Sequence, residues 1–392
     1  MDCTMAPPKC FKIELLSGRA PVYYPGSVIE GNVEIELTEP MRPIQAIKII
    51  LIGGGFTSWE ELRAIGRRSY MITFTEEEII LGNIITELWI RGNYTTVVGA
   101  PQQLVGLPAG KHNFPFKICL APNLALPSSL EKPYGHIRYM LKAGICTSQL
   151  RQFKFTTEKH ISVNSLIDVN LPSFVLPLTK SNEKTVCCCC CASGPIAMTV
   201  TTDRSAYCSG ESIAITVITE NFSKRRIEYV QADLKQTIRF HGEPTLRGRA
   251  VLNVKDSNKE IINTIQSIKG SADWHNKLMS IPVTVPTVSS SQIIQVFYTL
   301  DVFLYIRNAL NLHTKFPIVI GSVPYKGPSA ASTVNLHYST IAQRSLSATV
   351  QHSVYTNANV MGDLYYSPMY GYVKDYQFAP EGADSDLQQE PS

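Results

Sequence analysis

Hydrophobic and polar residues alternate with a period of two along most of this chain. The clearest runs begin at residues 33, 47 and 213, and their apolar members are Val33, Ile35, Leu37, Ile47, Ile49, Leu51, Ile213, Ile215 and Val217. In a β-strand this spacing places the apolar side chains on one face. The runs are rich in β-branched residues and are bounded by turn signals such as Pro25-Gly26. The pattern therefore predicts an all-β chain built from β-sandwiches.

The most apolar stretch of the chain, residues 292–312, is also predicted to be a strand. Gln295, Asp301 and Arg307 interrupt it, whereas a membrane-spanning helix needs about 20 nearly uncharged residues. One face of the expected strand carries Val296, Tyr298, Leu300 and Val302.

The order of these signals repeats once along the chain. Tyr24 and Gly26 precede a strand-like run in the first half, and Tyr207 and Gly210 precede another in the second half. Later, residues 137–143 resemble residues 296–302 in the same order. We therefore expect two homologous domains, at residues 11–170 and 194–325. The alternative is that any two β-sandwiches share such signals.

Two segments lack the alternation. Residues 171–193 contain prolines, polar residues and a run of cysteines, which predicts a linker. Residues 326–392 hold seven tyrosines and many Ser, Asn and Gln, but little aliphatic periodicity. Because such a segment buries too little apolar surface to fold alone, we expect a flexible C-terminal tail.

Composition and charge exclude two classes of protein. Charged residues make up 17% of the chain and hydrophobic residues 44%, a balance that excludes a mainly disordered chain. The net charge of +4 is too small for a protein that works mainly by neutralising nucleic-acid phosphates. The N-terminal segment MDCTMAPPKCFK lacks the apolar stretch of a signal peptide, so we expect a cytosolic protein with reduced thiols.

The sequence contains no recognisable catalytic or metal-binding motif. Gly53-Gly54-Gly55 follows a strand but lacks the downstream glycine and Lys-Ser/Thr of a phosphate-binding loop. Neither a Gly-x-Ser-x-Gly elbow nor a His-Glu-x-x-His pair occurs, and the histidines are scattered singly. We therefore predict no catalytic residue, cofactor, metal ion or small-molecule substrate.

Half of the ten cysteines form one run, which consists of Cys187, Cys188, Cys189, Cys190 and Cys191. The run contains two Cys-x-x-Cys spacings, but a structural zinc site needs four ligands and no second pair lies nearby. Clustered thiols beside a flexible segment are suited to carry acyl chains that attach a cytosolic body to a membrane. Lipidation is therefore the functional hypothesis. The alternatives are an unmodified linker and a thiol-based redox or metal-binding regulator.

Several phrases of the sequence resemble the arrestin family, specifically its α-arrestin (arrestin-domain-containing) branch. They are VYYPGSVIEGNVEIEL and HNFPFKICLAPNLALPSSLEKPYGHIRYMLKA in the first half, and SGPIAMTVTTDRSAYCSGESIAITVITENFS and FPIVIGSVP in the second. The resemblance spans residues 11–325 in the family's order. It implies two tandem arrestin-like (immunoglobulin-like) β-sandwiches. It also implies a non-enzymatic adaptor that links membrane cargo to ubiquitin ligase and to endocytic or endosomal sorting machinery.

The partners implied by the resemblance are the cytoplasmic tails of receptors or transporters, at the plasma membrane and on endosomes. The densest basic spots are Arg67 with Arg68, and the run Lys224, Arg225 and Arg226. Cationic loops bind phosphorylated segments or anionic lipid, so these residues are candidate contacts for an anionic partner. The alternative is that they are solvated loop residues.

In α-arrestins the usual ligase link is a Pro-Pro-x-Tyr motif in the tail, which WW domains of HECT-type ubiquitin ligases bind. The nearest match here, Ser367-Pro368-Met369-Tyr370, has serine in place of the first proline. Losing one proline contact costs about 1–2 kcal/mol, which is on the order of tenfold in affinity. We therefore expect weak ligase binding through Ser367, Pro368 and Tyr370. The alternatives are an ordinary tyrosine-rich tail and a ligase-independent cargo-sorting scaffold of the retromer-subunit type.

Overall fold

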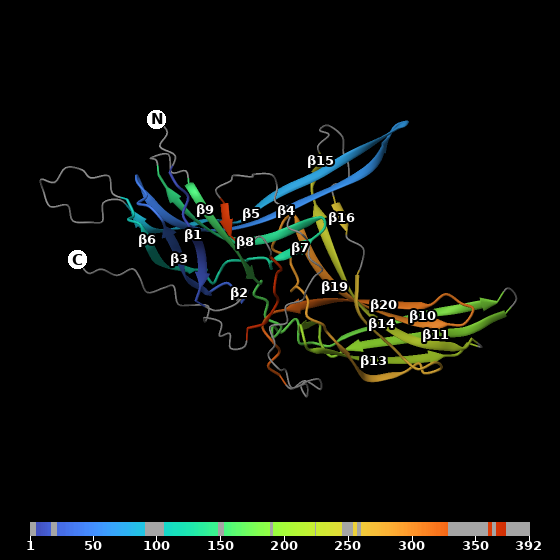
Figure 1. The fold of residues 1–392 in the computed structure, drawn as a ribbon. Coiled ribbons are helices and arrows are strands. Elements are labelled where there is room, and N and C mark those ends of the chain that lie inside the picture. Colours follow the sequence, from blue (N-terminus) through green and yellow to red (C-terminus); the bar gives the residue numbers. More distant parts are fainter. Residues whose placement is uncertain are drawn as a thin grey trace, which may run out of the picture.

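The computed structural model consists of strands and the loops that connect them (Figure 1). It describes residues 5–16, 22–90, 106–147, 153–188, 191–223, 225–244, 254–256, 260–327, 360–362 and 366–373. No helix occurs within these ranges, so none of the described segments is a helix capable of crossing a membrane. The prediction of an all-β chain is confirmed.

The first domain packs a small sheet against a large one. The small sheet has the order β1-β3-β6, with β1 (Cys10–Leu15), β3 (Val28–Leu37) and β6 (Gly110–Cys119). The large sheet has the order β15-β5-β4-β8-β9-β2, with β7 beside β8 and β21 beside β9. Its strands are β2 (Val22–Tyr23), β4 (Ala46–Ile65), β5 (Arg68–Ile90), β7 (Leu130–Lys132), β8 (Gly135–Cys146), β9 (Phe153–Val163), β15 (Glu243–Pro244) and β21 (Val360–Gly362).

The second domain is also a sandwich of two sheets. One has the order β10-β11-β13-β18, with β10 (Leu178–Cys188), β11 (Cys191–Thr202), β13 (Ser212–Asn221) and β18 (Trp274–Ser280). The other has the order β12-β20-β19-β14-β16, with β17 also paired to β14. Its strands are β12 (Ala206–Cys208), β14 (Ile227–His241), β16 (Val254–Asp256), β17 (Glu260–Gln266), β19 (Ile294–Ile306) and β20 (Leu312–Gly321). The apolar stretch at 292–312 thus contains the predicted strand, β19, with its expected inner face buried.

Equivalent positions of the sequence repeat have the same geometry in both domains. Gly26 and Gly210 both adopt the left-handed backbone region, with φ of 88° and 89°. Tyr139 on β8 donates its hydroxyl hydrogen bond to the Pro127 carbonyl (2.8 Å), and Tyr298 on β19 donates one to the Val285 carbonyl (2.5 Å). The two halves therefore repeat a turn and a buried tyrosine, in addition to their hydrophobic pattern.

The segment predicted to be a linker, residues 171–193, contains an edge strand of the second domain. β10 pairs with β11 in antiparallel register from Leu178 opposite Thr202 to Cys188 opposite Cys191. Side chains on β10 are mostly exposed, so this strand lacks the apolar alternation on which the prediction relied. Backbone hydrogen bonds to β11 hold β10 in the sheet. Cross-strand hydroxyl pairs such as Thr179–Thr201 (3.0 Å) stabilise this pairing further.

The expectation of a flexible tail at 326–392 also differs from the structure in part. β21 adds to β9 as a parallel strand, and residues 366–373 lie against both domains. The sequence pattern did not show this, because the apolar surface that these residues cover belongs to the two sandwiches.

The β4–β5 hairpin of the first domain supports the second domain. Thr57 Oγ1 donates to the His241 carbonyl (2.5 Å), and the Glu78 carboxylate accepts from Ser291 Oγ (2.5 Å) and from the Gln292 amide (3.0 Å). β15, from the second half of the sequence, pairs with residues 74 and 75 of β5. The two sandwiches thus share one sheet edge.

Candidate functional site

The two domains meet where the end of β9 lies beside the end of β20. Ser322 Oγ donates to the Ser165 carbonyl (2.8 Å) and accepts from the Ile167 amide (2.9 Å). The Asn170 side chain donates to the Pro324 carbonyl (2.9 Å) and accepts from the Lys326 amide (2.8 Å). These bonds tie the end of the first domain to the end of the second.

The tail segment 366–373 lies in a crevice between the two domains and contacts both of them. On the first domain, Tyr366 Oη donates to the Ile161 carbonyl (3.0 Å), and the Met369 amide donates to Ser162 Oγ (3.1 Å). On the second domain, the Val373 amide donates to the Ser322 carbonyl (2.7 Å). The Asn164 side-chain amide, oriented to satisfy its neighbours, donates to the Met369 carbonyl (3.3 Å). The segment is therefore held by directed bonds as well as by apolar contact.

The degenerate ligase motif lies inside this docked segment. Pro368 and Met369 are buried, Tyr370 packs against the hydrophobic core, and only Ser367 is exposed. Pro368 and Tyr370 also line a cavity of about 260 Å³ between the domains. Burial raises the pKa of the Tyr370 phenol well above its ordinary value. Because a WW domain grips the proline and tyrosine of its ligand, it has no access to this motif while the segment is docked.

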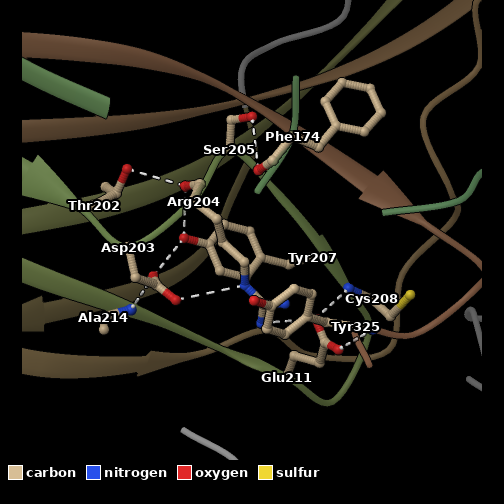
Figure 2. A network of polar contacts seen from close by, with 10 residues as sticks. All are labelled: Phe174, Thr202, Asp203, Arg204, Ser205, Tyr207, Cys208, Glu211, Ala214 and Tyr325. Atoms are coloured by element: carbon tan, nitrogen blue, oxygen red, sulfur yellow. Dashed lines mark hydrogen bonds and ion pairs between the residues drawn. The ribbon is translucent and has the colours of Figure 1, made fainter. Parts of the chain in front are cut away.

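A buried arginine that the sequence analysis did not single out organises the start of the second domain (Figure 2). The Arg204 side chain is 3% exposed and forms ion pairs with Glu211 (3.1 Å) and Asp203 (3.5 Å). Its guanidinium lies between two rings, with its centre 4.5 Å from the Tyr207 ring and 4.3 Å from the Tyr325 ring. The available signal was the charge pattern Asp-Arg with a Glu seven residues later, because a buried arginine requires carboxylate partners.

Glu211 extends this network to the end of the domain. Its carboxylate accepts from the Cys208 amide (2.9 Å) and from the Tyr325 amide (3.1 Å), which follows β20. Burial raises the pKa of the Cys208 thiol well above its ordinary value, and burial also raises the pKa of the Cys146 thiol. Both thiols are therefore poor nucleophiles.

The basic residues named by the sequence do not form one patch. Arg67 and Arg68 are exposed at the tip of the β4–β5 hairpin in the first domain, whereas Arg225 and Arg226 lie in the loop between β13 and β14 in the second. Lys224 lies outside the described residues.

The cysteine run lies at the turn of the β10–β11 hairpin. Cys187 pairs with Ala192 and Cys188 with Cys191, while Cys189 and Cys190 lie outside the described residues. The Phe222 amide donates to the Pro195 carbonyl (3.0 Å), which places the β13–β14 loop beside β11, a few residues from the turn of this hairpin. The structure thus brings the cysteine run and the basic pair Arg225 and Arg226 to one end of the second domain.

Within the described residues, no group of three or more His, Cys, Asp or Glu side chains is arranged to hold a metal ion.

Comparison with known proteins agrees with this architecture. The chain matches the model of the arrestin (or S-antigen) N-terminal domain over residues 11–170 and that of the C-terminal domain over residues 192–325. Human arrestin domain-containing protein 4 is 30% identical over 310 residues, which cover 78% of this chain and 69% of that protein. The mouse protein of that name is 30% identical over 311 residues, with coverage of 78% and 70%. The thioredoxin-interacting protein of pig is 24% identical over 302 residues, with coverage of 77% and 71%.

Both family models match in order and together span most of the chain, and they fall on the two sandwiches described above. The chain therefore belongs to the arrestin family, as a member of its arrestin-domain-containing (α-arrestin) branch.

Proposed function

We propose that this protein is a non-enzymatic cytosolic adaptor that binds the cytoplasmic tails of receptors or transporters. It links them to a WW-domain HECT-type ubiquitin ligase and to endocytic or endosomal sorting machinery. One observation carries the proposal: an extended segment with a proline–tyrosine motif is bound across the two domains. A body that holds its own extended segment in this way has the surface that a peptide-binding adaptor needs.

The ligase step depends on the release of the docked segment. Pro368 is buried and Tyr370 packs on the core, so a WW domain binds only the fraction of molecules in which the segment has left the crevice. The observed affinity is then the intrinsic affinity reduced by that fraction. We therefore expect weak binding of the WW domain for two reasons: the motif lacks its first proline, and segment 366–373 is docked between the domains.

A pulldown with isolated WW domains tests this step. We expect weak capture of the wild-type chain, loss of capture for Tyr370→Ala, and roughly tenfold stronger capture for Ser367→Pro, which completes the Pro-Pro-x-Tyr motif. Ser367 is exposed, so its replacement does not disturb packed side chains. Equal capture of the wild type and Tyr370→Ala, or no capture even of Ser367→Pro, would contradict the ligase link.

A specific observation favours a second candidate, a ligase-independent cargo-sorting scaffold of the retromer-subunit type. The motif lacks its first proline, and what remains of it is covered. Cargo association that persists unchanged in Tyr370→Ala, without ubiquitination of that cargo, would select this scaffold.

We also propose that the protein associates peripherally with the plasma membrane and endosomes through the free end of the second domain. The cysteine hairpin lies at the same end of that domain as Arg225 and Arg226, and Phe222 is 70% exposed. Acyl chains on cysteines and basic side chains near anionic lipid are the two signals that together give stable anchoring. Hydroxylamine-sensitive acyl exchange should label Cys187 to Cys191. A segment without label would remove the lipid anchor from the proposal.

The thiol-based or metal-binding regulator is the least supported function. One relative is named for interacting with thioredoxin, but the buried thiols Cys146 and Cys208 have raised pKa values. Stoichiometric zinc in the purified protein, or a mixed disulfide with thioredoxin, would establish this function instead.

A further inference from the structure

The outer face of the large first-domain sheet carries a groove that the functions above do not use. It has a volume of about 470 Å³ and crosses β5, β4, β8 and β9. The strand register places Gly54 at its centre, opposite Ile79 on β5 and Arg138 on β8. The groove is thus a hollow in a sheet face, and it is distinct from the cavity that Pro368 and Tyr370 line.

Gly54 opens this hollow, because it has no side chain on the outer face. A Cβ atom placed there would come no closer to any neighbour than 3.4 Å, to the Glu78 carbonyl oxygen. At the adjacent Gly53, a Cβ atom would lie 2.8 Å from Leu81 and Tyr139 in the core. Of the three consecutive glycines, Gly53 is therefore required by packing, whereas Gly54 leaves a space that a partner's side chain fits.

The groove presents apolar surface beside a strand edge. Ile79 is 86% exposed, and Ile85 further along β5 is also exposed. In the described residues, the outer edge of β5 pairs only with β15, at residues 74 and 75. Exposed apolar side chains in a hollow mark a binding site, and an open strand edge offers backbone bonds to an extended peptide.

The charge around the groove is negative. Arg138 is already paired with Glu131 through two bonds (2.5 and 2.8 Å), and burial lowers the pKa of His136 to about 4, which leaves this imidazole neutral. Glu77 is exposed and lies opposite Phe56, on the same face of the sheet as Gly54. The Glu78 carboxylate lies on the other face, where it accepts from Ser291 and Gln292 of the second domain. An exposed carboxylate beside an apolar hollow therefore favours a partner that is both apolar and basic.

We propose that this groove binds an extended, basic segment of a membrane-protein cargo, with one apolar side chain seated over Gly54 and a flanking Lys or Arg side chain beside Glu77. The proposal deepens the adaptor function and rests on it. Cytoplasmic segments next to membrane spans are enriched in Lys and Arg, so the chemistry of the groove matches that class of segment. The docked tail lies at one end of the groove, where Tyr366 packs on His160 with ring centroids 5.1 Å apart.

The test measures binding of a fluorescent 12-residue peptide of alternating Lys and Leu to the full chain by anisotropy. We expect this probe to bind at least tenfold more tightly than a Glu/Leu or a Lys/Ser peptide of equal length. Gly54→Leu should fill the hollow and weaken binding at least tenfold. The matched control is Gly82→Leu, on the same hairpin, where a new Cβ atom meets nothing within 4 Å. It should leave the affinity within twofold.

A second pair of variants covers the case in which Gly54→Leu does not fold. Ile79→Ser removes an exposed side chain, and Glu77→Lys reverses one charge at the rim; both should weaken the probe severalfold without changing the melting temperature. Unchanged binding of the Lys/Leu peptide by Gly54→Leu and Ile79→Ser would contradict the proposed binding site. Binding of the Glu/Leu peptide as tight as that of the Lys/Leu peptide would also contradict it. The WW-domain pulldown is independent of these variants, so its failure would count against the ligase link alone.

Discussion

Arg204 shows how one buried charge joins distant parts of the second domain. Its guanidinium lies between the rings of Tyr207 and Tyr325, and its partner Glu211 receives the amides of Cys208 and Tyr325. The start of the domain at β12 and the chain that leaves β20 are therefore tied to the same two side chains. A charge removed from water in this way is stable only while its carboxylate partners are present.

We predict that Arg204→Met lowers the free energy of unfolding by about 3–5 kcal/mol, because it leaves the buried Glu211 without a cation. Arg204→Lys should restore little of this loss, since an ammonium cannot lie flat between two rings as a guanidinium does. Urea denaturation measures the loss. Full stability of the lysine variant would contradict the stacking argument.

His136 predicts a pH dependence of stability. Burial lowers its pKa from 6.5 to about 4 in the folded chain, so between these values the unfolded chain binds more protons than the folded one. Stability is therefore full above pH 6.5 and falls as the pH falls towards 4. The contribution lost between pH 7.5 and pH 5 should be about 1–2 kcal/mol after allowance for partial exposure.

Urea midpoints at the two pH values test this expectation. His136→Gln should lose less stability than the wild type on acidification, whereas His275→Gln, at an exposed position, should behave like the wild type. An equal loss of stability between pH 7.5 and pH 5 in all three proteins would show that His136 is not the group responsible.

At the scale of elements, strands form here by two different means. β19 has the apolar alternation that buries one face, whereas β10 is an edge strand that backbone pairing and hydroxyl pairs hold in place. Turns also contribute, because Gly26 and Gly210 direct the chain into β3 and β13 with φ near 90°. The Gly26 amide donates to the Leu120 carbonyl and the Gly210 amide to the Ile281 carbonyl, both at 2.9 Å.

We predict that Gly26→Ala costs about 1–2 kcal/mol of stability, because an alanine resists the left-handed region. Gly210→Ala should cost a similar amount. The control is Gly82→Ala, in a strand with open space around its Cβ position, which should change stability by less than about 0.5 kcal/mol. Thermal denaturation measures the stability of all three variants. Unchanged stability of Gly26→Ala would contradict the prediction that this turn requires glycine.

At the scale of the whole molecule, the tail joins the two domains. Residues 366–373 bond to Ser162 at the end of β9 and to Ser322 after β20. A movement of one domain relative to the other would change the distances in these bonds, so we expect docking of the tail to be coupled to the interdomain angle. Access to Pro368 and Tyr370 then depends on the arrangement of the whole body.

We predict that the amides of Met369 and Val373 exchange slowly with solvent deuterium, because each donates a hydrogen bond in the crevice. Ser162→Ala removes the acceptor for Met369 and should speed exchange across residues 366–373 by roughly tenfold. Ser181→Ala, which removes an exposed hydroxyl pair on β10, should leave that exchange unchanged. Rapid exchange in the wild-type chain would show that the segment is not docked.

The amino-acid sequence alone determined the fold class, the repeat and the family. These follow from local patterns: alternation such as that of residues 296–302, the turn glycines, and phrases in a fixed order. Each pattern involves neighbouring residues, and period-two alternation indicates the strand and its buried face directly. The segment of β10 and the tail lack this alternation, so the sequence predicted a linker and a flexible tail where the structure has a strand and a docked segment.

Only the tertiary structure decided the sites. Ser162, Asn164 and Ser322 bind the tail, Arg204 meets Tyr325, and Gly54 opens a groove against Ile79 and Arg138. None of these pairings is close in sequence. A polar residue such as Ser162 shows no periodic signal, because its role depends on which distant backbone group reaches it. The covering of Pro368 and Tyr370 has the same cause: whether a motif is accessible depends on the surface against which it packs.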